Sequence, residues 1–257
     1  ISCLAVLRKQ KLMQKKILII DDYDDLRTAL SEEFSKTGHF VESSSNRDDG
    51  LSLMEKGDFD VVITDLDGDD LIPNADDIDN QRSSVKAFKV CVPSFHDEKF
   101  SEDEIKDCVG TILKYKSQYI DRNKEIEERH EKIEFEIPSL IGLMHTVLDY
   151  LVKRVEKIGV VNPDKSNLFV ALDEAFVNAV KHGNKFNSEK HVRVTAEITP
   201  QEARFTIEDE GEGFDVSKIP NPTDIENLFK ASGRGVMFMY NIMDEVIYNS
   251  RGNRITM

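Results

Sequence analysis

Short, solidly apolar runs alternate with an amphipathic segment in the first third of the chain. Residues 17–20 (ILII) follow two lysines and end at two acids, which is typical of a buried strand in a parallel sheet. An amphipathic helix is predicted over about residues 24–36, and a second apolar strand, residues 59–64, ends at Asp65. This alternation predicts a doubly wound α/β domain over residues 15–100, in which sites lie at the carboxyl ends of strands.

From residue 105 the apolar spacing changes to sevens, which predicts a linker helix over residues 101–131. The heptad puts at its d positions Ile105, Ile112, Tyr119, Ile126 and Ile133, and at its a positions Val109, Lys116, Asn123 and His130. Such a helix could pair with its copy as a coiled coil, with polar a residues fixing the register. A homodimer is the expected assembly, while packing of the helix on its own domain stays open.

A second domain is predicted over residues 132–257. It opens with the alternating strand 133–137 (IEFEI), and Pro138-Ser139 then start an apolar-periodic helix. The next helix, residues 167–184, carries polar side chains at i, i+4, i+7 and i+8, which are Glu174, Asn178, Lys181 and His182. These four share one face, although a polar face is more often simply solvated.

Two strands are predicted next, and a glycine-containing segment follows them. Asp209 ends the second strand, and Gly211 and Gly213 follow at alternate positions, where glycine allows a ligand to approach the backbone closely. An ionised carboxylate only accepts hydrogen bonds, so an exocyclic amine such as that of adenine suits Asp209. A turn between strands would have the same composition, so this motif alone is weak.

A second glycine-containing segment precedes the last apolar helix. Gly233, Arg234 and Gly235 stand at its start, where free N–H groups and the helix dipole favour phosphate. A simple helix cap is about as common an explanation.

In this order and spacing, the three motifs resemble the N, G1 and G2 boxes of the Bergerat-type (GHKL) ATP-binding fold, an α/β two-layer sandwich. Residues 132–257 look most like the anti-sigma factor serine kinases of bacterial partner-switching systems. The matching segments are LDEAFVNAVKHGN, DEGEGFD and GRGVMFMYNIMDEV. The resemblance implies ATP and Mg²⁺ as cofactors.

The same resemblance implies a role for each matched residue. Glu174 would be the base that helps a substrate Ser or Thr hydroxyl attack the γ-phosphate, Asn178 would hold Mg²⁺, and Asp209 would read adenine. The nucleotide pocket would be shaped by Gly211, Gly213, Gly233 and Gly235, and its phosphate side would be lined by Lys181, His182 and Arg234. Such roles suit phosphoryl transfer, which is mostly positioning and charge neutralisation. The chain departs from the family at Gly252-Asn253, where Gly-Thr is usual, and this concerns one polar contact near adenine.

A conventional histidine kinase is the rival reading, because His130-Glu131 superficially resembles a phosphoacceptor site. That class needs a helical hairpin, and only a few residues separate His130 from the strand 133–137. The spacing leaves no room for the second helix of the hairpin. A histidine within the linker is the favoured interpretation.

In the first domain, the acids Asp21, Asp22 and Asp65 resemble the acidic pocket of response-regulator receiver domains, which have a flavodoxin-like fold. The resemblance implies that Asp21 and Asp22 help bind Mg²⁺ and that Asp65 accepts a phosphoryl group, a use that suits carboxylates crowded at strand ends. Simple termination of strands by solvated acids is the alternative.

The receiver resemblance is incomplete beyond Asp65. A strand at residues 86–95 looks like the usual Lys-Pro strand, but Val92-Pro93 stand in that place only 27 residues after Asp65. On this alignment the switch Thr and the Lys are both missing. Taking Ser94 as the switch hydroxyl removes the final strand and its Lys instead. A pseudo-receiver that senses by protein contact therefore stays open beside aspartyl phosphorylation.

Composition narrows the class of protein. The 257 residues carry 34 bases and 49 acids, a net charge of −15, which argues against a direct nucleic-acid binder. Residues 21–80 hold 19 acids and 4 bases, so this segment accounts for the whole imbalance. No run is long and apolar enough for a membrane span, and the cysteines, Cys3, Cys91 and Cys108, suit a reducing cytoplasm. Residues 1–14 are expected to be a tail.

The sequence therefore predicts a cytoplasmic, ATP-dependent protein serine/threonine kinase of the anti-sigma factor type, controlled by the receiver-like domain. Its expected partners are a small anti-sigma-factor antagonist as substrate, a sigma factor as a further client, and an upstream histidine kinase. Two alternatives stay open: a nucleotide-binding module that sequesters a partner without turnover, and a phosphorelay receiver with a degenerate ATPase domain.

Overall fold

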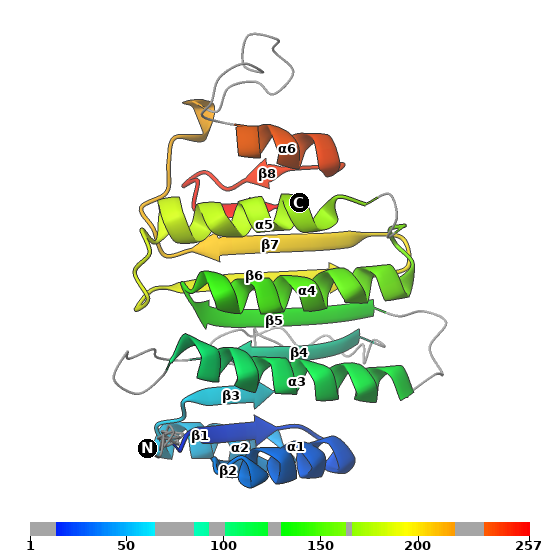
Figure 1. Ribbon diagram of the computed structural model, residues 1–257, viewed down its shortest axis with the longest axis vertical. Coiled ribbons are helices and arrows are strands. Elements are labelled where there is room, and N and C mark those ends of the chain that lie inside the picture. Colours follow the sequence, from blue (N-terminus) through cyan, green and yellow to red (C-terminus); the bar gives the residue numbers. More distant parts are fainter. Residues whose placement is uncertain (1–13, 65–84, 93–100, 123–129, 163–165, 219–233) are drawn as a thin grey trace, which may run out of the picture.

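The described residues form one nine-stranded sheet with helices packed against it (Figure 1). The computed structural model describes residues 14–64, 85–92, 101–122, 130–162, 166–218 and 234–257. The strand order is β2-β1-β3-β4-β5-β6-β7-β9-β8. The strands are β1 (Lys16–Ile20), β2 (Phe40–Ser44), β3 (Val61–Thr64), β4 (Val85–Cys91), β5 (His130–Pro138), β6 (His191–Ile198), β7 (Ala203–Asp209), β8 (Ile247–Tyr248) and β9 (Arg254–Thr256). The helices are α1 (Asp24–Lys36), α2 (Arg47–Lys56), α3 (Glu102–Arg122), α4 (Ile141–Ile158), α5 (Leu168–Asn178) and α6 (Arg234–Ile242), and short turns occupy Ala179–Gly183 and Val216–Lys218.

The first three strands alternate with helices. β1, α1 and β3 correspond to predicted elements, whereas β2 and α2 were not predicted from the sequence. β1 pairs in parallel with β2 and with β3. Ile17 and Ile19 belong to the main core, whereas Leu18 and Ile20 pack with α2 on the opposite face, so the strand is buried on both sides. Continuous burial on two faces explains why this strand is apolar at every position.

The strand β4 departs from an all-parallel receiver arrangement. It pairs antiparallel with β3 and in parallel with β5. A parallel neighbour of β3 would need a crossover, usually a helix, whereas an antiparallel neighbour needs only a connecting loop. The 20 residues between β3 and β4 are long enough for either connection, so the length of this segment alone does not decide the direction of β4.

Helix α3 lies on its own chain. Its a and d positions Ile105, Val109 and Ile112 are buried in the main core. The heptad pattern does not continue as helix to its end, because His130 and Ile133 belong to β5. The intrachain alternative is therefore what the structure shows for the first half of the pattern, while Asn123 and Ile126 lie outside the described residues.

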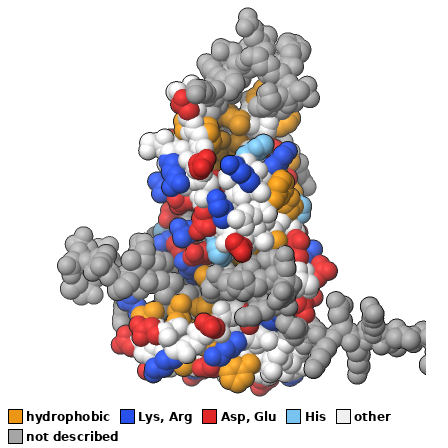
Figure 2. Space-filling view, turned by 90° about the vertical axis from the view of Figure 1, so that its left-hand side faces the viewer, with side chains coloured by type: hydrophobic (Ala, Val, Ile, Leu, Met, Phe, Trp, Pro, Cys, Tyr) orange, Lys and Arg blue, Asp and Glu red, His pale blue; other side chains and the backbone are white. Residues whose placement is uncertain are grey.

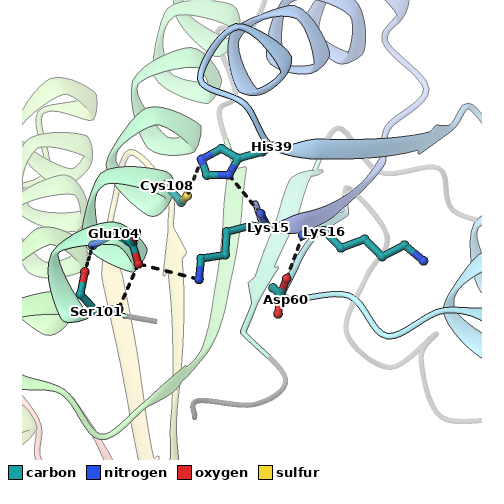
Figure 3. Close-up of polar contacts among 7 residues, drawn as sticks. All are labelled: Lys15, Lys16, His39, Asp60, Ser101, Glu104 and Cys108. Atoms are coloured by element: carbon teal, nitrogen blue, oxygen red, sulfur yellow. Dashed lines mark hydrogen bonds and ion pairs between the residues drawn. The ribbon is translucent and has the colours of Figure 1, made fainter. Parts of the chain in front are cut away.

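Polar contacts fix the start of α3 beside β1 and β2 (Figure 3). Ser101 and Glu104 form a capping box, with each backbone N–H donating to the other residue's side chain. The ammonium of Lys15, only 2% exposed, lies 3.8 Å from Glu104, and the backbone N–H of Lys15 donates to His39 Nδ1 at 3.3 Å. His39 Nε2 in turn lies 3.9 Å from Cys108 Sγ, and burial raises the pKa of that thiol to about 11.

In the second half of the chain, all described helices that pack on the sheet cover one face. Figure 1 shows α3, α4 and α5 side by side in front of the strands. β5 alternates between buried and half-buried residues, and its half-buried face is polar, with Lys132, Glu134 and Glu136. This is the two-layer arrangement that the sequence predicts for residues 132–257.

A buried ion pair attaches α4 to β5. Arg154 and Glu131 are 1% and 2% exposed, and Arg154 donates to both carboxylate oxygens of Glu131, from Nε at 2.9 Å and from a terminal nitrogen. A two-pronged contact of this kind is geometrically specific. It fixes the rotation of α4 over the sheet.

The strand directions place Asp21, which follows β1, and Asp209, which ends β7, at opposite ends of the strands of the sheet. β3 and β4 are antiparallel, β4 and β5 parallel, and β6 is antiparallel to both β5 and β7. β7 therefore runs opposite to β1, so Asp209 and Asp21 lie at different ends of the strands. The sequence-predicted sites form two separate places in one sheet.

No helix in the described part of the chain combines the length and the apolar character that crossing a bilayer requires.

Candidate functional site

A cavity of about 640 Å³ opens where β7 ends, between α5 and α6. Its volume falls within the range of about 300–1,000 Å³ typical of small-molecule sites. The lining comes from the three segments that the sequence singles out and from the last strands: Glu174, Ala175, Asn178, Ala179, Lys181, His182, Gly183, Ile207, Asp209, Gly213, Phe214, Gly235, Val236, Met239, Tyr248, Gly252, Asn253 and Ile255.

One face of the α5 segment supplies four of the predicted side chains. Ala171, Leu172 and Phe176 bury the other face of α5 in the core, so Glu174 and Asn178 point to the cavity. Asn178 Nδ2 donates to Glu174 Oε1 at 3.0 Å. The helix then widens into a π-helical turn over Ala179–Gly183, a local form frequent at functional sites, and this turn carries Lys181 and His182 along the cavity wall.

Two glycines are required where the backbone approaches the carboxylates of Glu174 and Asp209. A Cβ atom on Gly235 would lie 1.7 Å from Glu174 Oε1, and one on Gly183 would lie 2.2 Å from Asp209 Cγ. Gly235 is a predicted site residue, whereas sequence reasoning missed Gly183. Because Gly235 has no side chain, the N-terminal turn of α6 can lie against the carboxylate of Glu174. The N-terminus of a helix is a place that favours an anion.

Asp209 ends β7 inside the cavity. Burial raises the pKa of its carboxyl above the ordinary value, and the backbone N–H of Gly211, which donates to Oδ1 at 2.8 Å, offsets part of this rise. Gly211 does not line the cavity itself; its N–H holds Asp209 in place. A hydrogen-bond acceptor with apolar neighbours such as Ile207 and Met239 suits the amino edge of a heterocyclic base.

The buried side chain of Asn184 links the end of the α5 segment to the residue after β5, to the start of β6 and to the residue after β7, and sequence reasoning missed it. Its Nδ2 donates to Ser139 Oγ at 2.7 Å and to the carbonyl of His191 at 2.8 Å, while its Oδ1 accepts from the N–H of Glu210 at 2.9 Å. Ser139 and Glu210 are distant from Asn184 in the sequence, while His191 is seven residues away. The only signal is a short polar residue at the end of the predicted helix.

Asn249 organises the loop that follows β8. Its Oδ1 accepts from the backbone N–H groups of Gly252, Asn253 and Arg254 at 2.8, 3.1 and 3.2 Å. Its Nδ2 donates to Asn253 Oδ1 at 2.9 Å, and Asn253 Nδ2 donates to the carbonyl of Asp209 at 2.8 Å. The side chain of Asn253, the residue at which the sequence departs from the pattern of the resemblance, is therefore engaged in holding the backbone of Asp209.

The Asn249 loop and the Gly213 segment fit against each other through two left-handed glycines. Gly213 and Gly252 have φ angles of 78° and 77°, and a Cβ on either would lie 2.0 to 2.2 Å from the carbonyl oxygen of Arg251 or Phe214. Only glycine fits such a pair of positions without strain. Phe214 then meets Tyr248 edge to face at 5.4 Å, which forms an aromatic wall of the cavity.

We expect Asn249→Ala to lower the free energy of unfolding by about 1–3 kcal/mol, because three backbone N–H groups lose their acceptor. The matched variant is Asn249→Asp, which keeps an acceptor oxygen and loses only the donor to Asn253. Urea denaturation of the two variants checks this. Equal stability of Asn249→Ala and the parent protein would show that the loop does not depend on these bonds.

Two predicted site residues, Gly233 and Arg234, lie at the start of α6 in the sequence. Arg234 is the first residue of α6, and Gly233 lies outside the described residues.

Within the described part of the chain, no three His, Cys, Asp or Glu side chains are grouped closely enough to hold a metal ion. The donor set at the cavity, an amide and a carboxylate, nevertheless fits Mg²⁺, because this ion usually takes one or two protein ligands and completes its shell with phosphate and water.

Asp21 and Asp22, two of the first-domain acids, have different surroundings in the structure. Asp21 is 0% exposed, and its Oδ2 lies 2.5 Å from the ammonium of Lys116 on α3. Its Oδ1 accepts from the N–H of Tyr23 at 3.0 Å. Asp22 is exposed, and Asp65 lies outside the described residues. A lysine thus reaches the acidic strand end from a helix, where sequence reasoning expected none.

The structure also bears on the histidine-kinase reading. His130 is the first residue of a strand, and its neighbour Glu131 is taken up by the ion pair with Arg154. A phosphoacceptor histidine would need an accessible helical position beside a free acid. Neither condition holds at His130.

Comparisons with known proteins agree with the geometry of the cavity. Residues 137–257 match the family described as histidine kinase-like ATPase domain. The serine-protein kinase RsbW of Staphylococcus epidermidis is 29% identical over 140 residues, which cover 51% of this chain and 88% of the relative. The serine-protein kinase RsbW of Staphylococcus aureus (strain JH9) is 27% identical with the same coverage. The second half of the chain is thus similar to histidine kinase-like ATPase domains and to serine-protein kinases.

Proposed function

We propose that this chain is an ATP- and Mg²⁺-dependent protein serine/threonine kinase of the anti-sigma factor type. The observation that carries the proposal is the convergence of Glu174, Asn178, Asp209 and Gly235, from three separate segments, on one cavity. The similarity to serine-protein kinases supports the choice of acceptor. Its substrate is a small anti-sigma-factor antagonist, and a sigma factor is the further client.

Each residue at the cavity has a task in this reaction. Asp209 would accept a hydrogen bond from the adenine amine, and Asn178 would hold Mg²⁺, which would neutralise phosphate charge when bound. Lys181 and His182, together with the N-terminal turn of α6, face the phosphates. Gly235 leaves the space in which Glu174 stands beside that turn.

Glu174 acts as the base. The hydroxyl oxygen of the acceptor Ser or Thr forms a bond to the γ-phosphorus while the bond from that phosphorus to the β–γ bridging oxygen breaks. The hydroxyl proton passes to the Glu174 carboxylate, and ADP carries the bridging oxygen away. Most of the acceleration comes from position and charge neutralisation, and the base adds to it.

Regulation belongs to the first half of the chain. We place its output on α3, because this helix contacts Asp21 through Lys116 and contacts α4 through Glu102, whose Oε1 accepts from the N–H of Gly142 at 2.8 Å. An upstream histidine kinase acting on Asp65, and pairing of two chains as a homodimer, belong to the same proposal.

The test is phosphoryl transfer from γ-labelled ATP to a cognate antagonist in the presence of Mg²⁺. We expect acid-stable label on Ser or Thr of the antagonist. Acid-labile label on the chain itself would favour the histidine-kinase reading. ATP binding without transfer to any cognate antagonist would favour the module that binds nucleotide and sequesters a partner.

A further inference from the structure

Two consecutive residues beside the nucleotide cavity have a backbone conformation that their side chains disfavour. Lys185 and Phe186 have φ angles of 57° and 58°, and they are the non-glycine residues with positive φ in the described part of the chain. The left-handed region brings the Cβ of an L-residue close to the following carbonyl, so a bulky side chain rarely adopts it. We call these two residues the 185–186 tip.

The surrounding structure holds the tip in this conformation. Asn184, directly before it, is buried and makes the three hydrogen bonds described above. The N–H of Phe186 donates to the carbonyl of Val180 at 2.9 Å, and the N–H of Asn187 donates to that of Asn184 at 3.1 Å. The strained backbone is therefore held by the buried side-chain amide of Asn184 and by a hydrogen bond to the π-helical turn.

The side chain of Phe186 contributes little to the packing of the folded protein. Phe186 is 57% exposed, the largest exposed fraction among the large hydrophobic side chains of the described residues. Strain that persists without a packing gain clusters at functional sites. Aromatic side chains, Phe among them, are also enriched at the cores of protein interfaces.

The charge around the tip is the reverse of the charge of the whole chain. Residues 181–193 contain four Lys or Arg and one acid, whereas the chain carries −15 overall. Lys181 and Lys185 are exposed, whereas Arg193 pairs with Glu136 at 3.4 Å, and a carboxylate oxygen of Glu210 accepts from the N–H of His191 at 3.0 Å. Figure 2 looks onto the edge of the sheet where β7 ends and shows Lys and Arg side chains gathered in its upper half near a hydrophobic area. This local surface complements an acidic partner and repels acidic segments of the chain itself.

We propose that the 185–186 tip docks the protein substrate through an acidic surface next to its phosphoacceptor hydroxyl. The position supports this, because Lys181 and His182 line the cavity and the tip begins three residues after His182. Phe186 inserts its ring into an apolar spot of the partner, and Lys185 pairs with carboxylates around that spot. The proposal rests on the function proposed above and adds where the substrate binds.

The main variant is Phe186→Gly, because glycine removes the ring and also relieves the positive φ. We expect its melting temperature to be equal to or above that of the parent, while the KM for the antagonist rises at least tenfold and the KM for ATP stays within twofold. Lys185→Glu should raise the KM for the antagonist by a similar factor. It should also make antagonist binding less sensitive to salt than in the parent protein, because the charge of Lys185 is lost.

Two controls use the same substitutions elsewhere on the second half of the chain. Phe169→Gly removes an exposed ring at the other end of α5, which stacks on His145, and Lys153→Glu reverses an exposed charge on α4. Both should leave the KM for the antagonist within twofold. A KM for the antagonist that is unchanged in Phe186→Gly and Lys185→Glu would overturn the proposal, as would a parallel loss of ATP affinity, which would show a role in shaping the cavity.

Failure of the docking proposal is distinguishable from failure of the proposed function. Binding of the unphosphorylated antagonist to the full chain, measured by fluorescence anisotropy without ATP, does not require transfer. Weaker binding to Phe186→Gly in a protein that transfers no phosphate would support the tip and reject the kinase. Binding of single-stranded DNA or anionic vesicles that Phe186→Gly abolishes, with antagonist binding intact, would reject the docking proposal.

Discussion

Glu174→Gln should lower the rate of phosphoryl transfer by about 10²–10⁴-fold, the usual contribution of a general base. Glutamine keeps an oxygen that can accept from Asn178 Nδ2, so the contact at 3.0 Å can persist while proton acceptance is lost. Nucleotide affinity should therefore change by no more than a few-fold. Single-turnover transfer to the antagonist measures the first quantity, and equilibrium binding of a fluorescent ATP analogue measures the second.

The neighbouring acid provides a matched control for this variant. Asp173 lies on the same helix, and its Oδ1 contacts His145 Nε2 at 3.1 Å instead of lining the cavity. Asp173→Asn should transfer phosphate at nearly the parent rate. If Glu174→Gln kept more than a tenth of the parent rate, Glu174 would not be the base, and charge neutralisation around the phosphates would carry the reaction alone.

Lys116→Met should lower the free energy of unfolding by about 3–5 kcal/mol, because it leaves the buried carboxylate of Asp21 without its partner. Asp21 is 0% exposed and lies 2.5 Å from the ammonium of Lys116, so water cannot replace the lost cation. Urea denaturation followed by circular dichroism measures the loss. The control is Lys114→Met, an exposed lysine on the same helix, for which a change within about 0.5 kcal/mol is expected.

A second variant separates the lost charge pair from lost packing. Asp21→Asn combined with Lys116→Met removes both charges and keeps the oxygen that accepts from the N–H of Tyr23. The double variant should be more stable than Lys116→Met alone, since no uncompensated charge remains. A double variant as unstable as the sum of the two single variants would show that the contact is not an ion pair of the folded protein.

Local pattern predicted much of the second half of the structure. The i, i+4, i+7 and i+8 spacing placed Glu174, Asn178, Lys181 and His182 on one face, and the structure brings all four to one cavity. The alternation of residues 133–137 predicted a strand, which is part of β5. Such patterns succeed because they depend only on the period of the element and on which side is buried.

Long-range pairing lay beyond the reach of these patterns. Periodicity could not show that β4 would reverse against β3, nor that α3 would bury its heptad positions Ile105 and Val109 within the same chain. A heptad stripe and a core-facing stripe look alike along a sequence, because both repeat every three to four residues. The buried partner of the stripe decides between them.

The residues missed at the cavity share one physical property. Asn184 and Asn249 act through hydrogen bonds to backbone groups, and Gly183 acts by the absence of a side chain next to Asp209. None of these functions leaves a periodic trace or a recognisable charge cluster. For Gly183 and for most of the bonds of Asn184 the partner is identified only once distant segments lie side by side, whereas Asn249 bonds to residues three to five positions away.

The pairing of β4 with β5 affects how the protein can be divided. Seven residues of β5 are matched in parallel to β4, and α3 shields the flank of α4. A fragment starting at Lys132 would carry a bare strand edge and an uncovered apolar flank, and both invite aggregation or self-association. Adding residues 85–122 alone would leave β4 without β3, its antiparallel neighbour, so the second half of the chain is best produced as part of the full chain.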